Sequence, residues 1–396
     1  MNFLLIHPSP GILGGIETLM GRMSRWLLDH DHQVTILTNS DEKWREVVPK
    51  EARFVALGDR FGALKYHFHT RKLLKELDIP APDVIKSFNI KSAWVAAQIA
   101  TCFNNGCKVI AGNYNPNVFT VECPANSLAF WRMNGLYLRN FLNYIPRNAR
   151  LFCEVAQIEE LQKTHQQEGL LWPLPIDTRH FAPARRQPKA GKIVSVGRIS
   201  PMKEYNLYMI DVIKELIRRG HDVTWSVYGE GPYEPEVRRR IKEEGLESVI
   251  SLEGTVPYER YLQVLQDASV FVGMGTSIFE ASLFRVPNVV ACAYDRQGVT
   301  YGPIYRLPQG SLGQSNASPP RFKVVDEIER ILELSPAAYE AEQEAVYHHV
   351  QVHTMEQSMT RFLELVRQAD RIKRREPAFY LASYPLHLVD RAFTRP

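Results

Sequence analysis

Cysteine is scarce in this chain of 396 residues, and the few cysteines are not spaced to bind a metal ion. The thiols are odd in number and scattered, at positions 102, 107, 123, 153 and 292. This pattern excludes a zinc site built on paired cysteines and gives no sign of a disulfide framework. It favours reduced thiols that serve packing.

The sequence also lacks a long apolar run and a strong charge of either sign. No stretch approaches the ~20 uncharged apolar residues of a membrane-spanning helix. The start MNFLLIHPSP has no basic residues before its apolar run, so it indicates a first strand rather than a signal peptide. With 48 basic and 44 acidic residues the formal charge is only +4, and we expect no nucleic-acid partner. We expect a cytoplasmic protein, at most bound peripherally at the inner face of the cytoplasmic membrane.

Short apolar runs alternate with amphipathic segments of helix length, which is typical of a parallel sheet covered by helices on both faces. The alternation stops in the Pro-rich residues 172–192 and restarts after them. The sequence therefore predicts an α/β protein with two Rossmann-like domains facing a cleft. The expected domains are residues 1–178 and 185–362, with residues 363–396 returning to the first domain.

Chemically active side chains gather in loops after the strands of the second half, where open α/β sheets bind ligands. In VGRISPMK, Arg198 and Lys203 place two cations on one short loop, which can neutralise a diphosphate leaving group. Solvated surface charge is the alternative. In YGEGP, Gly229 and Gly231 permit close backbone approach before Pro232, although a plain strand-to-helix turn gives the same pattern.

A further loop of this kind is GMGTSIFE. Gly273 and Gly275 leave backbone N–H groups open to an anion, and Thr276 or Ser277 is expected to cap the helix that follows. Glu280 would then lie in the first turn of that helix. Two roles fit this carboxylate: a capping-box contact with Ser277, or acceptance of two hydroxyls from a ribose.

Taken in order, these loops resemble those of the GT-B glycosyltransferases, in the large retaining group that includes sucrose and glycogen synthases. GRISPMK, GEGP and EASLFRVP stand where that family has GR-x-x-x-x-K, G-x-G-P and E-A-x-x-x-x-x-P around its nucleotide-sugar site. The segment PGILGGIETL resembles the family's Gly-Gly-x-Glu loop, and PLPIDTRHFAP resembles its interdomain linker. The resemblance covers nearly the whole chain.

The resemblance implies transfer of a sugar, with retention, from a nucleotide diphosphate sugar to a glycan or lipid-linked glycan in cell-surface polysaccharide synthesis. Residues 1–178 would bind the acceptor and residues 185–362 the donor, with no metal and no cofactor besides the donor substrate. Arg198 and Lys203 would be catalytic. The expected donor-binding residues are Gly197, Gly229, Gly231, Pro232, Gly273, Gly275, Thr276, Ser277 and Glu280.

The first half supplies a second, smaller set of expected site residues. Gly14 and Gly15 after the first strand would approach a donor phosphate or the acceptor, with a plain turn as the rival interpretation. Tyr114 and Asn115 stand where many relatives have a histidine.

The chain also departs from the family pattern at Val272, which stands where the family usually has a first glutamate that contacts the transferred sugar. Backbone N–H groups of Met274 to Ser277 are a replacement for that contact. Two other functions therefore stay open: a nucleotide-sugar epimerase on the same scaffold, and a non-catalytic nucleotide-sugar-binding partner of a transferase.

Residues 130–152 carry four arginines, six aromatic residues and no acid. Basic, aromatic segments of helix length suit the headgroup region of an anionic membrane, so we expect a peripheral membrane contact here. The alternative is a core helix with arginines that reach out to solvent. The four arginines are Arg132, Arg139, Arg147 and Arg150.

Overall fold

The computed structural model describes residues 1–8, 15–40, 44, 47–65, 67–103, 106–114, 128–178, 186–257, 260–311, 313 and 321–372. The chain forms two compact units. Unit 1 comprises Met1–Pro175 and Ser358–Pro396, and unit 2 comprises Ile176–Gln357.

The unit boundaries lie a few residues before those expected at 178, 185 and 362. The backbone N–H of Ile176 already donates to the carbonyl of His353 within unit 2, at 2.7 Å. The indole of Trp172 donates to the carbonyl of Ser358 within unit 1, at 3.0 Å. At both points where the chain passes from one unit to the other, a hydrogen bond joins residues far apart in the sequence. The local composition of the sequence does not reveal such bonds.

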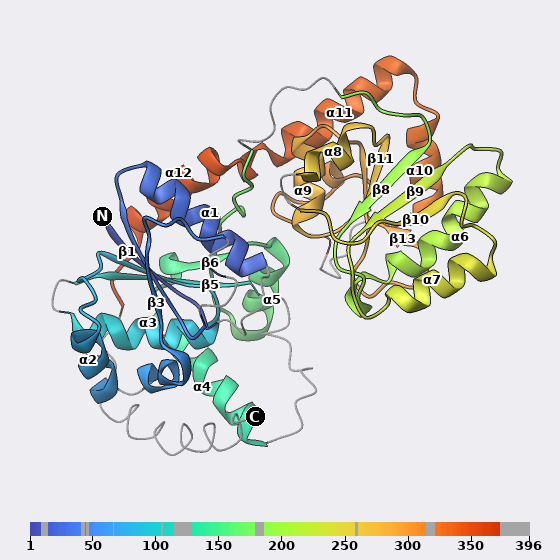
Figure 1. The fold of residues 1–396 in the computed structure, drawn as a ribbon. Coiled ribbons are helices and arrows are strands. Elements are labelled where there is room, and N and C mark those ends of the chain that lie inside the picture. Colours follow the sequence, from blue (N-terminus) through green and yellow to red (C-terminus); the bar gives the residue numbers. More distant parts are fainter. Residues whose placement is uncertain are drawn as a thin grey trace. The chain divides into compact units, whose positions relative to one another are not determined.

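Unit 1 contains a seven-stranded parallel sheet (Figure 1). In spatial order its strands are β3 (Arg53–Ala56), β2 (Gln33–Thr38), β1 (Asn2–Ile6), β4 (Val84–Ser87), β5 (Lys108–Asn113), β6 (Arg150–Phe152) and β7 (Leu170–Leu171). Its helices are α1 (Gly15–Asp29), α2 (His67–Glu76), α3 (Ile90–Cys102), α4 (Leu128–Tyr144), α5 (Val155–His165) and α12 (Met355–Gln368), with 3-10 turns at Gly58–Lys65 and Arg147–Ala149.

Packing against the sheet determines where these helices lie. Helices α2, α3 and α4 pack together on one face, and α1 and α12 lie on the other (Figure 1). Although α12 begins at Met355, in unit 2, its Phe362 packs on Trp172 and Phe3, with ring centroids 5.2 and 6.2 Å away. Apolar burial thus holds the C-terminal helix in unit 1.

Unit 2 contains a five-stranded parallel sheet in the order β10 (Ile250–Leu252), β9 (Thr224–Tyr228), β8 (Lys192–Val196), β11 (Val270–Gly273) and β12 (Asn288–Val290). A small antiparallel pair, β13 (Val299–Thr300) and β14 (Phe322–Lys323), lies beside it. Its helices are α6 (Tyr205–Arg218), α7 (Glu234–Glu243), α8 (Tyr261–Gln266), α9 (Thr276–Leu283), α10 (Val324–Leu332) and α11 (Pro336–Val350), with 3-10 turns at Pro201–Lys203, Ile304–Arg306 and Gln351–His353.

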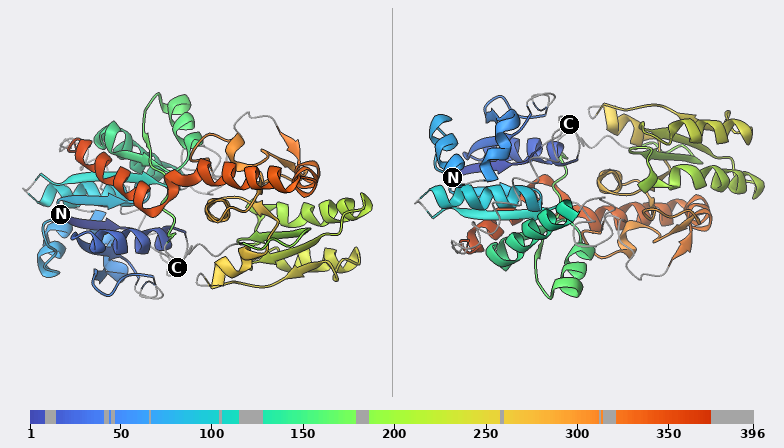
Figure 2. Two further views of the ribbon diagram at one scale, coloured as in Figure 1. Left: turned by 90° about the horizontal axis from the view of Figure 1, so that it is seen from above. Right: turned by 90° about the horizontal axis from the view of Figure 1, so that it is seen from below.

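The helices of unit 2 cover both faces of its sheet (Figures 1 and 2). Helix α6 packs against α7 and α10, and α9 packs against α11. The core under α6, α7 and α10 contains the fully buried Trp225, whose indole donates to the hydroxyl of Ser195 at 3.0 Å. The prediction of two Rossmann-like α/β domains is confirmed.

Both sheets contain a point at which the chain reverses its direction across the sheet. From β8 the chain moves outward to β9 and β10, then returns to β11 on the other side of β8. In unit 1 the corresponding reversal lies between β1 and β4. Ligands of open α/β sheets bind beyond the carboxyl ends of the two strands at such a point. Functional side chains are therefore expected in the loops that follow these strands.

Candidate functional site

The loops after β8 and β11 flank the reversal point of unit 2. The first is GRISPMK and the second is GMGTSIFE, so the structure brings these two segments to one edge of one sheet. The loops after β9 and β10 continue the same edge. The motifs identified in the sequence thus lie in neighbouring loops at one end of the sheet.

A missing side chain makes room for Lys203. A Cβ atom added at Gly197 would lie 2.1 Å from the Lys203 Nζ, so the amine rests against the Gly197 backbone. The 3-10 turn Pro201–Lys203 folds the lysine back toward the strand end, and its carbonyl accepts a hydrogen bond from the Asn206 side chain at 2.9 Å. The spacing of Gly197 and Lys203 is therefore a packing requirement.

The Lys203 amine lies in a poorly solvated place beside a second cation. Burial, and to a smaller extent the positive charge of Arg198, lowers the pKa of Lys203 to about 8. Arg198 itself is exposed. Within the part of the chain that the structure describes, neither side chain forms an ion pair. Two cations without carboxylate partners at the end of a strand are suited to an anion, which would supply the missing counter-charge.

The loops after β8 and β9 approach each other through glycine. A Cβ atom at Gly229 would meet the Gly197 carbonyl oxygen at 2.1 Å, and one at Gly231 would meet the Ile199 carbonyl oxygen at the same distance. The backbone N–H of Gly197 donates to the Tyr228 carbonyl at 2.8 Å. Pro232 is exposed at the end of this turn. These glycines allow the loop after β9 to pack against the loop that carries Arg198 and Lys203, whether or not they also touch a ligand.

Helix α9 begins at Thr276, so the residue before it, Gly275, takes the N-cap position. Gly275, with φ +78°, is the N-cap residue, and no side chain caps the helix. The expectation that Thr276 or Ser277 caps α9 is wrong: both lie inside it, and the Ser277 hydroxyl donates to the Met274 carbonyl at 3.3 Å. Gly273 ends β11. The positive φ lets the chain turn into the helix without a polar cap.

This start moves Glu280 out of the first turn. Glu280 is the fifth residue of α9 (Thr276–Leu283) and is 7% exposed. A capping-box contact between Ser277 and Glu280 is therefore excluded. A largely buried carboxylate one turn into a helix at the ligand-binding edge remains suited to charged or hydroxyl partners.

The side chain of Val272 does not reach the loops at the carboxyl end of the sheet. It lies fully buried inside β11, and its carbonyl accepts a hydrogen bond from Ser195 at 2.7 Å. The contact that a glutamate would make from this position has no side-chain counterpart here. The backbone N–H groups of residues 274–277 stay the expected replacement for that contact.

Comparisons with known proteins agree with this fold. Residues 177–298 match the family described as glycosyl transferases group 1. The fold is similar to that of a glycosyltransferase from Rickettsia africae, with a TM-score of 0.66, 14% identity and coverage of 93% of this chain and 98% of that one. It is also similar to Anabaena Alr3699/HepE in complex with UDP and glucose, with a TM-score of 0.65, 14% identity and coverage of 93% and 100%.

This chain has the GT-B fold and is related to the group 1 glycosyltransferases. A curated relative is the phosphatidylinositol N-acetylglucosaminyltransferase GPI3 subunit of Saccharomyces cerevisiae, 23% identical over 305 residues. The match covers 68% of this chain and 63% of the relative, so the chain spans less than two thirds of that protein's length.

In the GT-B unit 1, the expected site residues are only partly described. Gly15 is the first residue of α1, and Tyr114 directly follows β5. Gly14 and Asn115 lie outside the described residues. Close to Gly15, Glu17 lies 3.6 Å from the Nε2 of His7, which follows β1 at the reversal point.

Tyr114 lies beside a side chain that the sequence analysis missed. Lys86, in β4, is fully buried, and its Nζ lies 5.3 Å from the Tyr114 ring centroid. The Tyr114 hydroxyl is buried and has no hydrogen-bond partner in the described part of the structure. A lysine inside an apolar strand such as DVIKSF was the available signal, because lysine is almost never fully buried.

The segment 130–152 is not one helix. Helix α4 ends at Tyr144, and the chain then forms a 3-10 turn and β6. Arg150 is buried, and its Nε donates to the Ile145 carbonyl at 3.0 Å, so this arginine is not available to a membrane. Arg139 and Arg147 are exposed, and the side chain of Arg132 lies outside the described residues. Among the described helices, none is long and apolar enough to span a membrane.

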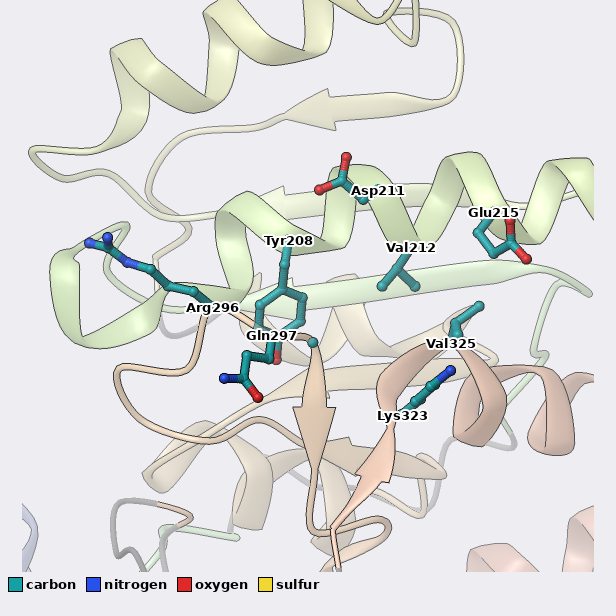
Figure 3. A pocket seen from close by; sticks show the side chains of 9 residues that line it. Tyr208, Asp211, Val212, Glu215, Arg296, Gln297, Lys323 and Val325 are labelled. Atoms are coloured by element: carbon teal, nitrogen blue, oxygen red, sulfur yellow. The ribbon is translucent and has the colours of Figure 1, made fainter.

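A pocket of about 240 Å³ lies near the loop of residues 197–203, which carries Arg198 and Lys203 and is called the cation loop below (Figure 3). It is bounded by α6 and by residues from the β12–β13 connection and β14, and Arg296 lines it. Neither Arg198 nor Lys203 lines this pocket. Arg296 links it to the site, because its guanidinium binds the buried carboxylate of Glu204, next to Lys203, at 2.9 Å.

A cluster suited to a metal ion lies before β9, at the other end of the strands. The ligand atoms of His221, Glu329 and Glu333 lie within 4.8 Å of one another. Glu329 already accepts hydrogen bonds from His221 at 3.0 Å and from Arg219 at 2.6 Å. This ion-pair network accounts for the cluster without an ion.

Proposed function

We propose that this protein is a retaining glycosyltransferase that moves a sugar from a nucleotide diphosphate sugar to a glycan or lipid-linked glycan. The observation that carries the proposal is the pair of cations, Arg198 and Lys203, at the reversal point of the unit 2 sheet. Both lack carboxylate partners in the described structure, and Lys203 is held against Gly197. A diphosphate is a doubly charged group that fits two such cations.

The proposed mechanism uses these cations on the leaving group. When the bond between the sugar and the diphosphate breaks, negative charge grows on the diphosphate oxygens, and Arg198 and Lys203 stabilise that charge. Glu280 accepts hydrogen bonds from the ribose hydroxyls, and the backbone of residues 273–277 supports the phosphates or the sugar. The departing phosphate assists attack by the acceptor hydroxyl on the same face, which retains the configuration.

The names of relatives support the choice of substrates. The yeast relative is a phosphatidylinositol N-acetylglucosaminyltransferase, and the Anabaena structure holds UDP and glucose. We propose UDP-N-acetylglucosamine as the first donor to test and a lipid-linked acceptor at a membrane surface. Assembly of a cell-surface polysaccharide would use both, on the inner face of the cytoplasmic membrane.

A thermal-shift screen of nucleotide sugars, followed by product assays with and without glycan acceptors, tests the proposal. Release of nucleotide only with acceptor supports a transferase. Conversion of the sugar without acceptor supports an epimerase. Binding without any turnover supports a non-catalytic partner.

Substitutions assign the roles within the site. Arg198→Ala or Lys203→Ala should lower kcat by about a hundredfold or more, as loss of one oxyanion donor does. Glu280→Gln should raise the donor KM by about ten- to a hundredfold, because a charge-assisted hydrogen bond is worth about 1.5–3 kcal/mol. The exposed Lys242→Ala on α7 is the matched control and should change neither. If Glu280→Gln melted early yet turned over normally, Glu280 would be structural.

A further inference from the structure

The connection between β12 and β13 holds the cation loop on both sides of Lys203. The backbone N–H of Tyr294 donates to the Met202 carbonyl at 3.0 Å. Two residues further along, Arg296 binds one carboxylate oxygen of Glu204, with its Nε at 3.0 Å and its Nη2 at 2.9 Å. Figure 3 shows the Arg296 side chain extending from this connection. Met202 and Glu204 directly precede and follow Lys203, so a segment distant in the sequence fixes the backbone around this lysine.

The two partners of the Arg296–Glu204 ion pair differ in exposure. The Glu204 side chain is 5% exposed and the Arg296 side chain is 76% exposed. In the described part of the chain, no other donor reaches the Glu204 carboxylate. Loss of either partner therefore has an unequal cost. An arginine that loses the carboxylate is hydrated where it stands, whereas a buried carboxylate that loses the arginine keeps an uncompensated charge away from water.

An uncompensated charge at Glu204 would act on Lys203 through the backbone. The chain can relieve that charge by turning Glu204 toward water, and Lys203 is the residue before it. The Lys203 amine rests against the Gly197 backbone, 2.1 Å from the place of an added Cβ. A shift of the 3-10 turn Pro201–Lys203 would carry the amine out of this place. A displacement of about 1 Å in a catalytic group can lower the rate up to about a hundredfold.

We infer that Arg296 is a positioning residue, which holds Glu204 in its buried place and so fixes the Lys203 amine beside the leaving diphosphate. The inference rests on the proposed function, which uses Lys203 but gives no part to Arg296. Burial and the charge of Arg198 account for the lowered pKa of Lys203, and Glu204 does not contribute to it. The effect of Glu204 on the amine therefore runs through the backbone and not through its charge.

Substitution of each partner, and of both, tests this inference. Arg296→Ala should lower kcat by about tenfold, because it leaves the buried carboxylate unpaired. Glu204→Gln should stay within about twofold of wild type, and the double variant should return to that range, because neither contains an unpaired buried charge. Arg296→Lys, which keeps the charge, should fall between wild type and Arg296→Ala. Arg240→Ala is the matched control, because its partner Asp211, at 2.9 Å, is 60% exposed, and it should leave kcat unchanged.

Labelling of Lys203 with an amine-reactive reagent between pH 6 and 9, read by mass spectrometry, tests its position without any substrate. Arg296→Ala should raise the pKa of Lys203 from about 8, because a displaced amine is better hydrated. The double variant with Glu204→Gln should restore the wild-type value. The titratable groups placed beside the amine are Arg198 and the Tyr205 hydroxyl, whose pKa is raised by burial. Neither changes its charge in this pH range.

Three results would overturn the inference. The first is wild-type turnover or wild-type Lys203 labelling in Arg296→Ala. The second is a double variant as impaired as Arg296→Ala, which would mean that Arg296 contacts a substrate itself. The third is a defect in Glu204→Gln equal to that of Arg296→Ala. Absence of turnover by the wild type would instead refute the proposed function, and the labelling of Lys203 would then decide the inference by itself.

Discussion

Replacement of Lys86 by methionine should stabilise unit 1 near neutral pH. Lys86 is fully buried, and its only hydrogen bond in the described structure is donated to the Ser87 carbonyl at 3.2 Å. The rings of Phe88, Tyr114 and Trp172 surround the amine, with centroids 5.1 to 5.4 Å from its Nζ. Methionine has a similar length and no charge, so it fits this apolar site without a desolvation cost.

The size of the effect follows from the pKa of the amine. Burial lowers the pKa of Lys86 from 10.5 to about 7, while a nearby Cys153 opposes the shift. Because the folded state holds the proton less tightly than the unfolded state, unfolding takes up a proton between pH 7 and 10.5. At 1.36 kcal/mol per pH unit, the lysine costs about 5 kcal/mol below pH 7, and this cost disappears as the pH rises to 10.5.

Two opposing contributions reduce the stabilisation expected from Lys86→Met. The aromatic rings favour the charged amine, and methionine leaves the Ser87 carbonyl without its partner, each worth about 1 kcal/mol. Lys86→Met should therefore stabilise unit 1 by about 3 kcal/mol at pH 7 and by nearly nothing at pH 10.

Urea unfolding at pH 7, 8, 9 and 10 measures this difference, read from thiol labelling of Cys153, which is buried in unit 1. Lys75→Met, at an exposed position on α2, is the control and should show a difference from wild type that does not change with pH. Equal effects of Lys86→Met at pH 7 and pH 10, or destabilisation at pH 7, would refute the reasoning.

Two further predictions concern the loops and the surface of the protein. Gly197→Ala and Gly229→Ala should both lower stability, because their φ values of +149° and +139° strain any L side chain. Gly229→Ala should lower stability more, by about 1–3 kcal/mol, because its Cβ meets a backbone carbonyl, whereas the Cβ at Gly197 meets the end of the Lys203 side chain and should also lower kcat. Thermal melts beside kinetics check both, and equal melting losses would contradict the expected difference. The double variant Arg139→Gln with Arg147→Gln should reduce co-sedimentation with anionic liposomes, as high salt does. The control pair Arg238→Gln with Arg239→Gln on α7 should not reduce it. Unchanged sedimentation of the first variant would count against the membrane contact.

The sequence predicted the sheets and the cation loop because both depend on local patterns. Strand and helix periods are short-range, and the spacing from Gly197 to Lys203 covers one turn that packs on itself. The start of α9 depended on the φ of Gly275, which residue types alone do not determine, so Glu280 was placed one or two positions too early in the helix. Arg150 was misjudged for a different reason: the Ile145 carbonyl that accepts its guanidinium Nε–H faces it only after α4 has ended.

Lys86 and Lys203 are packed in the same way but differ in their electrostatic surroundings. Each amine lies where a glycine lacks a side chain: a Cβ at Gly112 would be 2.6 Å from the Lys86 Nζ, and a Cβ at Gly197 would be 2.1 Å from the Lys203 Nζ. Burial lowers both pKa values. Lys86 has no exposed surface, so burial favours its neutral form although rings enclose it. Lys203 keeps partial exposure beside a second cation, so we expect an anion entering from solvent to stabilise its charged form.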